Sequence, residues 1–481
     1  MATLPMRTDC RLAGSALAPW TEGRWIGEAP SAILGVCLDS RAVAPGDLFV
    51  ALSGATSDGH LFIRDAAARG AAAALVSSSG EASALPCLRV ADTLVALHAI
   101  ASHCRARYDG LMAALTGSVG KTTVKDMTAA ILSVLGPTLA TEGNFNNATG
   151  VPLTLLALAS HHQFAVVEIG MSLPGEISSL VPLVRPDIAA VINVKPVHLQ
   201  NFTSLADIAA AKAEILTGIR PGGIAVLNAD DSLVRAMRVP DAVRAVWFGR
   251  DSTSDLCLTS FGCVDVDRQH FTLRWRDREI EVTLGVPGDH NRFNAAAAAA
   301  IALAAGAGPD DVAAGLSQFT PSPMRSRLVH LTDGSILLED CYNASPDAFA
   351  AALHTIVHLP VEGRRVVVMG DMRELGDAAE VFHREVGARA AVAGIAELLA
   401  YGPLAEAAVR EFQRASPGGT GYYCTTSEEL VQHLLASHRP GDIILIKGSR
   451  AMALERVSAA LLAQFPPRAQ PGPSASPNPS S

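Results

Sequence analysis

The segment Thr116–Thr123, TGSVGKTT, is the sequence feature that most narrows the possible folds. It follows the short apolar run Leu111–Leu115, which is typical of a buried strand. The apolar residues that come after it recur at helical spacing: Val124, Met127, Ile131 and Leu135. A glycine-rich turn between a strand and a helix presents unpaired N–H groups at the positive end of the helix dipole. The sequence therefore predicts a phosphate-binding loop in an α/β domain.

Each residue of this loop has an expected role. Gly117 and Gly120 let the backbone approach phosphate oxygens, Lys121 neutralises the β and γ phosphates, and the Thr122 hydroxyl ligates Mg²⁺. The remaining nucleotide contacts are expected from Ser118, Val119 and Thr123. Leu115 stands where the general pattern has its first glycine, so the match is a variant. The alternative is an ordinary glycine-rich turn that caps a helix.

Three ionisable side chains follow later elements of the same block. Glu168 ends the apolar segment AVVEIG, His198 follows VINVKP, and Lys212 lies in the helical pattern LADIAAAKAEIL. Ligands bind at the carboxyl ends of parallel strands, so these residues are candidates for a catalytic and metal site. The alternatives are a helix cap for Glu168, a surface loop for His198, and an ion pair of Lys212 with Glu214.

The chain divides by pattern into blocks at 1–108, 109–320 and 321–465, with a Pro- and Ser-rich tail at 466–481 that we expect to be disordered. Short apolar strands alternate with helical patterns, which indicates parallel sheets covered by helices. The predicted strands are Leu48–Leu52, Leu111–Leu115, Ala165–Ile169, Ile188–Val194, Ile224–Asn228, Ser335–Glu339, Arg365–Met369, Leu398–Tyr401 and Asp442–Ile446. The segment Pro321–Arg327 is expected to be a hinge.

Composition excludes several classes of protein. The net charge of -9 argues against a general nucleic-acid binder, which needs excess Lys and Arg. No two cysteines stand at a CxxC spacing, so no zinc or redox motif is visible. The alanine-rich run that begins at Ala295 carries too little transfer energy for a membrane span and is expected to be a closely packed helix. The N-terminal residues lack the apolar stretch of a signal peptide.

Motifs spread from Asp39 to about Arg450 resemble the Mur ligase family. They are DSRAVAPGDLFVAL, TGSVGKTTVKDM, TEGNFNNATGVPLTLL, VEIGMSLPGEI, AAAKAEI, GDHNRFNAAAA, EDCYNASPDAF, VVVMGDMRELG and IKGSR. The resemblance implies three α/β domains: an N-terminal domain for the UDP-linked substrate, a central P-loop ATPase domain with a parallel sheet, and a Rossmann-like C-terminal domain for the incoming dipeptide.

The resemblance also implies an activity. NFNNATGVPLTLL and CYNASP are typical of the member that joins D-alanyl-D-alanine to UDP-N-acetylmuramoyl-tripeptide through an acyl phosphate, a step of peptidoglycan synthesis. The implied cofactors are ATP, two Mg²⁺ ions and a carbamylated Lys212. The implied partners are these small molecules alone, with no nucleic acid and no membrane span. The expected form is a cytoplasmic monomer.

Site residues carry over position by position. Lys121 matches the phosphate-loop lysine, and Glu168 and His198 match metal and phosphate ligands. The nucleotide-binding positions are Asn291, Asn294, Arg327 and Asp340. The positions expected along the UDP-linked peptide and the dipeptide are Ser40, Arg41, Asn144, Asn146, Asn147 and Asn343. The chain departs from the usual family residues at Lys195, Gln200, Ser326, Glu339, Cys341 and Ser345.

Three other functions remain open from the sequence. The first is a different amide ligase on the same scaffold, such as a folylpolyglutamate-type enzyme. The second is a P-loop switch protein, although no NKxD guanine motif occurs in the chain. The third is a catalytically silent homologue, suggested by the altered CYNASP loop.

Overall fold

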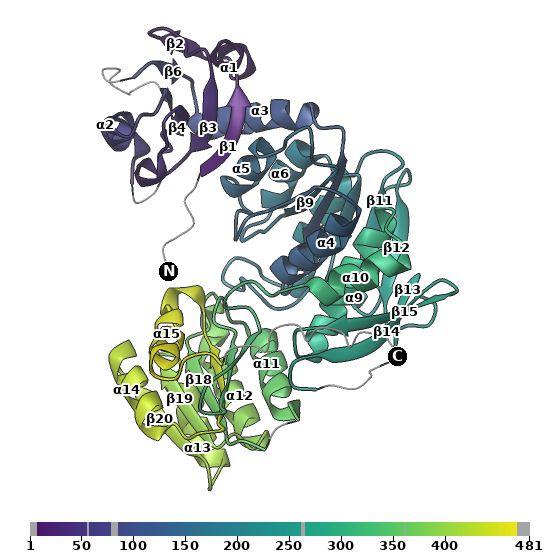
Figure 1. The fold of residues 1–481 in the computed structure, drawn as a ribbon, viewed down its shortest axis with the longest axis vertical. Coiled ribbons are helices and arrows are strands. Elements are labelled where there is room, and N and C mark those ends of the chain that lie inside the picture. The colour runs from purple at the N-terminus through teal and green to yellow at the C-terminus, as the bar shows by residue number, and fades with distance from the viewer. Residues whose placement is uncertain (1–6, 55–56, 78–84, 261–264, 361, 469–481) are drawn as a thin grey trace, which may run out of the picture.

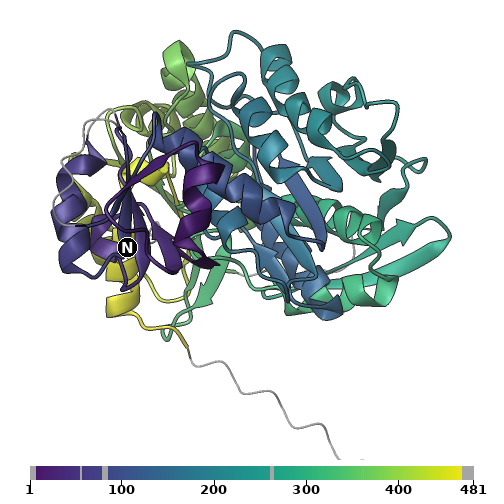
Figure 2. The ribbon, with the colours of Figure 1, turned by 90° about the horizontal axis from the view of Figure 1, so that it is seen from above.

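The computed structural model describes all residues except 1–6, 55–56, 78–84, 261–264, 361 and 469–481 (Figure 1). Three sheets follow one another along the chain, each built from its own block of sequence. Seen from above, the central sheet and its helices lie to one side of the other two units (Figure 2). The fold is mixed α/β, as predicted.

The N-terminal sheet has the strand order β1-β3-β4-β5-β6-β2, parallel from β3 to β6 and antiparallel at both edges. Its strands are β1 (Arg7–Leu12), β2 (Arg24–Ile26), β3 (Ile33–Cys37), β4 (Asp47–Val50), β5 (Ala73–Val76) and β6 (Cys87–Arg89). Its helices are α1 (Gly14–Trp20), α2 (Ile63–Ala68) and α3 (Thr93–Ala106), with short 3₁₀ turns at Ser40–Ala42 and Gly59–Phe62.

The central sheet has the order β15-β14-β13-β12-β11-β10-β7-β9-β8, parallel except for β14 and β15. Its strands are β7 (Leu111–Thr116), β8 (Thr138–Ala140), β9 (Phe164–Glu168), β10 (Ile188–Val191), β11 (Ile224–Asn228), β12 (Arg244–Gly249), β13 (Leu256–Ser260), β14 (Gln269–Trp275) and β15 (Arg278–Leu284). Its helices are α4 (Lys121–Leu135), α5 (Gly150–Leu156), α6 (Glu176–Val184), α7 (Leu205–Ala213), α8 (Ser232–Arg235), α9 (Asp289–Ala304) and α10 (Pro309–Gln318), with a 3₁₀ turn at Glu214–Gly218.

The C-terminal sheet has the order β16-β17-β21-β18-β19-β20, with only β16 antiparallel. Its strands are β16 (Arg327–His330), β17 (Ile336–Glu339), β18 (Arg365–Gly370), β19 (Glu397–Tyr401), β20 (Thr420–Cys424) and β21 (Ile443–Lys447). Its helices are α11 (Pro346–His358), α12 (Ala379–Val392), α13 (Glu406–Ala415), α14 (Ser427–Ser437) and α15 (Glu455–Gln464), with 3₁₀ turns at Gly376–Ala378 and Arg450–Met452.

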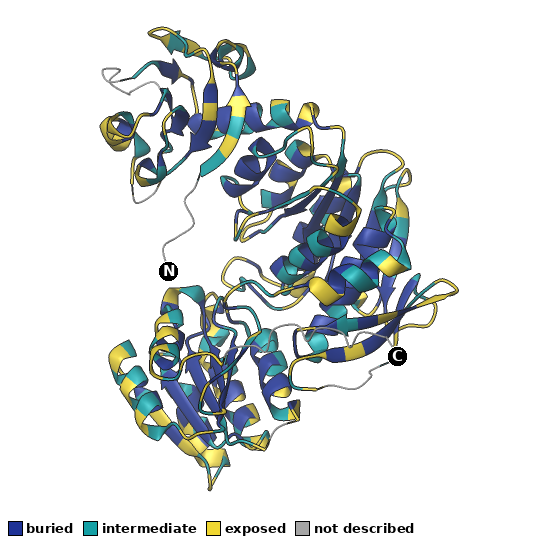
Figure 3. Cartoon of the chain, in the orientation of Figure 1, coloured by how far each residue is buried: buried dark blue, intermediate teal, exposed yellow. Residues whose placement is uncertain are grey.

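Side chains alternate across the central sheet and bury both of its faces. On β7, Met112 and Ala114 belong to one hydrophobic cluster, while Ala113 and Leu115 belong to another. The first cluster continues through α3 into the N-terminal sheet, so that sheet and the α5–α6 face of the central sheet share a core. Figure 3 shows the resulting buried strands between helices whose outer faces are exposed. Two-sided burial explains why the strands read as continuous apolar runs.

The predicted strands are confirmed, each within a few residues of its expected bounds. The strands β1, β2, β3, β5, β6, β8, β12 to β16 and β20 were not predicted from the sequence. In β15, for example, Arg278, Glu279 and Glu281 interrupt the apolar pattern. The alanine-rich run forms the buried helix α9, as expected. Among the described residues, no helix combines the length and apolar character needed to cross a bilayer.

The start of the predicted disordered tail is ordered. The Thr332 N–H donates to the Pro466 carbonyl at 3.0 Å, and the Arg468 N–H donates to the His330 carbonyl at 2.8 Å. These residues extend along the edge of β16, whose unpaired backbone groups accept and supply the bonds. Residues 469–481 of the predicted tail lie outside the described part of the chain.

Candidate active site

The phosphate loop connects β7 to α4. Gly120 precedes the helix with a φ of +82°, a left-handed conformation that favours glycine. A Cβ atom at Gly120 would lie 2.4 Å from the Asn294 side-chain oxygen, so glycine is also needed for space. The N-terminus of α4 therefore faces α9 with its N–H groups open to a bound anion.

Lys121 folds over the loop. Its Nζ donates to the carbonyl oxygens of Gly117 at 2.9 Å and Ser118 at 3.2 Å. Burial lowers the pKa of Lys121, an effect that Glu168 opposes and Arg325 strengthens. A polyphosphate would give this ammonium group a stronger partner than the two carbonyls, because charge-assisted hydrogen bonds are stronger.

Asn193, just beyond β10, holds the part of the phosphate loop formed by Ser118 and Val119. Its Oδ1 accepts from the backbone N–H groups of Ser118 and Val119, both at 3.0 Å. Its Nδ2 donates to the Val119 carbonyl at 2.9 Å. The Ser118 hydroxyl is fixed in turn by the backbone of Lys195. Asn193 therefore positions the loop from the neighbouring strand.

The substitution Asn193→Ala should loosen the phosphate loop without removing any charge. Losing bonds of about 1 kcal/mol each should raise the KM for ATP by ~10-fold or more, because the loop must be reordered on binding. Steady-state kinetics with ATP varied measure this effect. The matched control is Asn201→Ala, because Asn201 donates to the Ser172 carbonyl and lies outside the cavity. Equal KM values for the two variants would contradict the assignment.

Glu168 lies at the end of β9, with 1% of its surface exposed. Its Oε2 accepts from the Thr122 hydroxyl at 2.8 Å, and its Oε1 accepts from the Asn146 amide at 2.7 Å. The backbone N–H of Glu168 donates to the Thr141 hydroxyl. The helix-cap alternative is therefore wrong, since the carboxylate points to the phosphate loop. A carboxylate beside a hydroxyl is a donor set suited to Mg²⁺.

His198 joins the central and C-terminal units. Its Nδ1 lies 2.5 Å from the Glu374 carboxylate, which follows β18. Both residues have positive φ angles, +55° and +66°, in the strained region that often marks functional sites. Burial lowers the pKa of His198, while Glu374 raises it. A neutral imidazole has one nitrogen whose lone pair can bind a cation and one N–H group that can donate to phosphate.

Lys212 lies on α7, with 2% of its surface exposed. Burial, strengthened by the charge of Lys121, lowers the pKa of Lys212 well below its usual value. The predicted alternative, an ion pair with Glu214, is wrong. The Glu214 carboxylate instead accepts from the N–H groups of Gly175 and Ser178. Within the described residues, no carboxylate pairs with Lys212.

A cavity of about 1070 Å³ lies between the central and C-terminal units. The predicted site residues that line it are Ser118, Val119, Gly120, Lys121, Thr122, Thr123, Asn144, Asn146, Glu168, His198, Asn291, Asn294, Asp340 and Asn343. On α9, Asn294 donates to the Asn291 side-chain oxygen at 3.0 Å, and Asn291 donates to the Pro287 carbonyl at 2.7 Å. These bonds fix both amides beside the phosphate loop.

The C-terminal wall of the cavity is an ion-paired surface. Asp340 receives the Lys447 ammonium at 2.6 Å, and Lys447 is almost fully buried. The Asp340 Oδ1 accepts from the Ser326 N–H at 3.0 Å. Ser326, which replaces a usual glycine, has a φ of +50°, so this bond holds serine in a conformation that glycine favours. Asp340 thereby fixes the interdomain segment.

Several predicted residues lie outside this cavity lining. Arg327 points from β16 toward Glu339, 3.7 Å away, and Lys212 is buried on α7. In the N-terminal unit, Arg41 pairs with Asp39 at 2.8 Å, beside the buried Ser40. Two more predicted residues also lie outside the lining. Gly117 is packed against Ile192. The Asn147 Oδ1 accepts from the N–H groups of Thr149 and Gly150, where α5 begins.

Other cavity residues were not predicted from the sequence. The Arg325 guanidinium lies 3.8 Å from the centre of the Tyr342 ring, and Arg250 lies 4.4 Å from that of Phe293. The lining also includes Asn193, His290, Arg373, Glu374, Lys447 and Arg450. The motifs GDHNRFN, GDMRELG and IKGSR contain most of this second group. These motifs follow strands or precede a helix, and that placement is the sequence feature that could have indicated them as site residues.

Comparisons with known proteins agree with this arrangement. Three family models match the chain: "Mur ligase family, catalytic domain" over residues 32–105, "Mur ligase middle domain" over 115–302, and "Mur ligase, glutamate ligase domain" over 324–450. The UDP-N-acetylmuramoyl-tripeptide–D-alanyl-D-alanine ligase of Escherichia coli K12 is 40% identical over 430 residues, which are 89% of this chain and 93% of the relative.

Solved structures are similar over nearly the whole length. MurF from Acinetobacter baumannii is 32% identical, with a TM-score of 0.86 that covers 95% of this chain and 99% of the other. MurF ligase from Thermotoga maritima in complex with ADP is 28% identical, with a TM-score of 0.79 that covers 89% of this chain and 97% of the other.

Proposed function

The chain belongs to the Mur ligase family, and we propose that the cavity beside Lys121 and Glu168 is where it forms an amide bond with ATP. The reaction joins D-alanyl-D-alanine to UDP-N-acetylmuramoyl-tripeptide and releases ADP and phosphate. The product is the pentapeptide precursor of peptidoglycan. The observation that carries the site assignment is the bond between Thr122 of the phosphate loop and Glu168, at the floor of the interdomain cavity.

In the first step, the terminal carboxylate of the tripeptide attacks the γ-phosphorus of ATP. An oxygen–phosphorus bond forms, the bond to the bridging oxygen breaks, and ADP leaves. The loop N–H groups and Lys121 hold the β and γ phosphates in line and offset the negative charge that develops. Glu168 fixes the Thr122 hydroxyl, which donates to its carboxylate at 2.8 Å, at the start of the same helix.

In the second step, the amine of D-alanyl-D-alanine attacks the carbonyl carbon of the acyl phosphate. A carbon–nitrogen bond forms, phosphate leaves with the carbon–oxygen electrons, and the amine proton passes to solvent. The acyl phosphate must be kept from water until the amine arrives. The Asp340–Lys447 wall and the Arg325–Tyr342 pair form the side from which the dipeptide would enter.

The donor set fits Mg²⁺. Thr122 and Glu168 would hold one ion, and His198 with a carbamylated Lys212 would hold a second, so that bound Mg²⁺ screens the phosphate charge. Carbamylation needs a neutral amine, and burial favours that form of Lys212 by lowering its pKa. The modification would also place a negative charge on Lys212, close to the charges of Lys121 and His198.

The proposed functional units are residues 1–108 for the UDP moiety, 109–320 for ATP and 321–465 for the dipeptide. Ser40 and Arg41 would contact UDP, because Arg41 is exposed and free to exchange Asp39 for a diphosphate. Asn144 and Asn146 line the path from the N-terminal side toward Glu168. Asn147 supports them by starting α5, and Asn343 lies on the dipeptide side.

We propose that the C-terminal unit rotates about the segment 321–327 when substrates bind. Met324 and Ser326 have φ angles of +64° and +50°, so this segment stores strain that a changed backbone can relieve. Rotation would carry Arg327 from Glu339 toward the nucleotide. Small-angle scattering of the full chain should show a smaller radius of gyration with a non-hydrolysable ATP analogue, Mg²⁺ and UDP-N-acetylmuramoyl-tripeptide. An unchanged profile contradicts the rotation.

The proposed function is tested by reconstitution. Purified protein with Mg-ATP, UDP-N-acetylmuramoyl-tripeptide and D-alanyl-D-alanine should give the pentapeptide product by mass spectrometry. Phosphate release should require both other substrates, which a switch protein or a silent homologue would not show. Replacing the dipeptide with glutamate or a single amino acid should abolish the product. Turnover with glutamate would favour the folylpolyglutamate-type alternative.

The proposed form is a cytoplasmic monomer. Its substrates, ATP and a UDP-linked peptide, are cytoplasmic metabolites. Gel filtration with light scattering tests the monomer, and a stable dimer of about twice 50.0 kDa contradicts it.

A further inference from the structure

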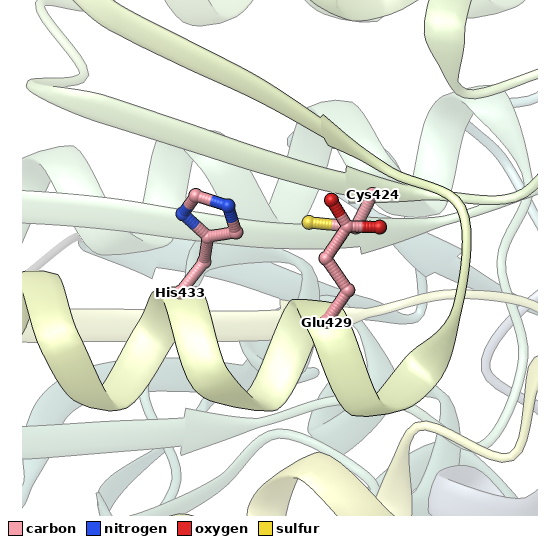
Figure 4. Close-up of side chains that lie close together, drawn as sticks. All are labelled: Cys424, Glu429 and His433. Atoms are coloured by element: carbon pink, nitrogen blue, oxygen red, sulfur yellow. The ribbon is translucent and has the colours of Figure 1, made fainter.

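A cluster of metal-ligand side chains lies at the outer edge of the C-terminal sheet, away from the cavity. Cys424 ends the edge strand β20, while Glu429 and His433 lie one turn apart on α14. Their ligand atoms all lie within 4.8 Å of one another. Figure 4 shows the imidazole and the carboxylate rising from the same face of α14 toward the thiol sulfur. None of the three lines the interdomain cavity.

The hydrogen bonds and ring contact of these three residues leave a ligand atom of each able to bind a metal ion. The Glu429 Oε2 accepts from the Thr425 N–H at 2.7 Å and the Thr425 hydroxyl at 2.9 Å. His433 stacks on Tyr422 with ring centres 4.9 Å apart. Within the described chain, no hydrogen bond ends on Glu429 Oε1, the Cys424 thiol or the His433 ring. The bonds to Thr425 fix the carboxylate, and one of its oxygens lies within 4.8 Å of the other two ligand atoms.

The residue types select the class of ion. Thiolate, imidazole and carboxylate together are ligands of zinc, whereas Mg²⁺ and Ca²⁺ avoid sulfur. In a tetrahedral site with bonds of about 2.0–2.3 Å, ligand atoms lie roughly 3.5 Å apart. The observed spacing can reach that value by small side-chain rotations, because two of the three residues are only half-buried.

We propose that Cys424, Glu429 and His433 form a zinc-binding site, with water in the fourth position. Zinc would bind the thiolate and release the thiol proton to solvent. The bound ion would fasten the edge strand β20 to α14. The spacing Cys-x4-Glu-x3-His is not a CxxC motif, which is why the sequence did not indicate this site.

Cobalt titration of the full chain, stripped of metal with EDTA, tests the proposal. We expect one Co²⁺ per chain to produce a thiolate-to-cobalt charge-transfer band, which one equivalent of Zn²⁺ removes. The substitution Cys424→Ser should abolish the band, and His433→Gln should weaken Co²⁺ binding at least 10-fold. Zn²⁺ should also raise the Tm of the wild-type protein and not that of Cys424→Ser.

Two controls separate this site from other metal binding. Cys104→Ser, which removes a thiol elsewhere, should keep the band, and so should Glu168→Gln, which changes the proposed catalytic site. Ligation activity should be the same in wild type and His433→Gln, which shows that the variant is folded. A wild-type protein without the band, or a band that survives in Cys424→Ser, overturns the proposal.

Discussion

Replacing Lys121 with methionine should lower kcat by ~10³-fold or more, because the transition state loses its main positive partner inside a low-dielectric site. The Nζ atom donates to the carbonyls of Gly117 and Ser118, both within the phosphate loop, and methionine keeps most of the volume of the side chain. The variant should keep the Tm of the wild-type protein. Single-turnover measurement of ADP formation, with all three substrates present, isolates the phosphoryl-transfer step.

Lys195→Met is the matched control, since Lys195 also lines the cavity but is exposed. Its long-range charge is screened, so kcat should change by less than ~10-fold. If the two variants lose activity equally, the effect is a general loss of positive charge. In that case Lys121 does not contact the β and γ phosphates as proposed.

Lys212→Ala should also lose nearly all activity, and a short carboxylic acid such as acetate or propionate should restore part of it. The substitution leaves a buried space that a small carboxylate can enter, where it replaces the anionic end of the proposed carbamate. Removing a metal ligand costs ~10²-fold or more. Initial rates of phosphate release, measured against acid concentration, should rise and saturate for this variant.

Lys125→Ala is the control for chemical rescue. Lys125 is also buried, and its ammonium donates to the Thr141 carbonyl at 2.7 Å, so its loss should weaken the support behind Glu168. No added acid should restore that variant, because it loses a cation that makes hydrogen bonds. Full activity of Lys212→Ala without acid, or equal rescue of both variants, would remove Lys212 from the metal site.

The parts of the site that the sequence predicted are those that local patterns encode. The phosphate loop and Glu168 each follow an apolar strand, and parallel strands bring such ends to one edge. The chain alone could not show that His198 meets Glu374, 176 residues away. That contact depends on how two separately folded units dock, which no periodicity records.

The interdomain segment shows a second limit of sequence reasoning. Arg327 was predicted from its motif, yet Arg325 lines the cavity and Arg327 faces Glu339. In a regular extended chain, Arg325 and Arg327 would point to the same side because they are two residues apart. Ser326, between the two arginines, has a left-handed backbone conformation that turns their side chains to different sides. Its hydrogen bond to Asp340, 14 residues away, cannot be read from the sequence.

Ser345 shows how a departure from the family pattern can be tolerated. It stands where the family has asparagine, and its hydroxyl accepts from the Ala348 N–H to begin α11. Serine and asparagine are similarly good N-caps, so the helix keeps its start. The altered CYNASP loop therefore retains its fold, which argues against a silent homologue.

A crystal structure with Mg²⁺ and a non-hydrolysable ATP analogue tests the central claim most directly. The account predicts the β and γ phosphates against the N–H groups that begin α4, with Lys121 turned away from the Gly117 carbonyl to meet them. It also predicts Mg²⁺ beside the γ-phosphoryl group, with one ion held by Glu168 and a second by His198. Phosphates bound elsewhere, or both side chains turned away with no cation between, would contradict it.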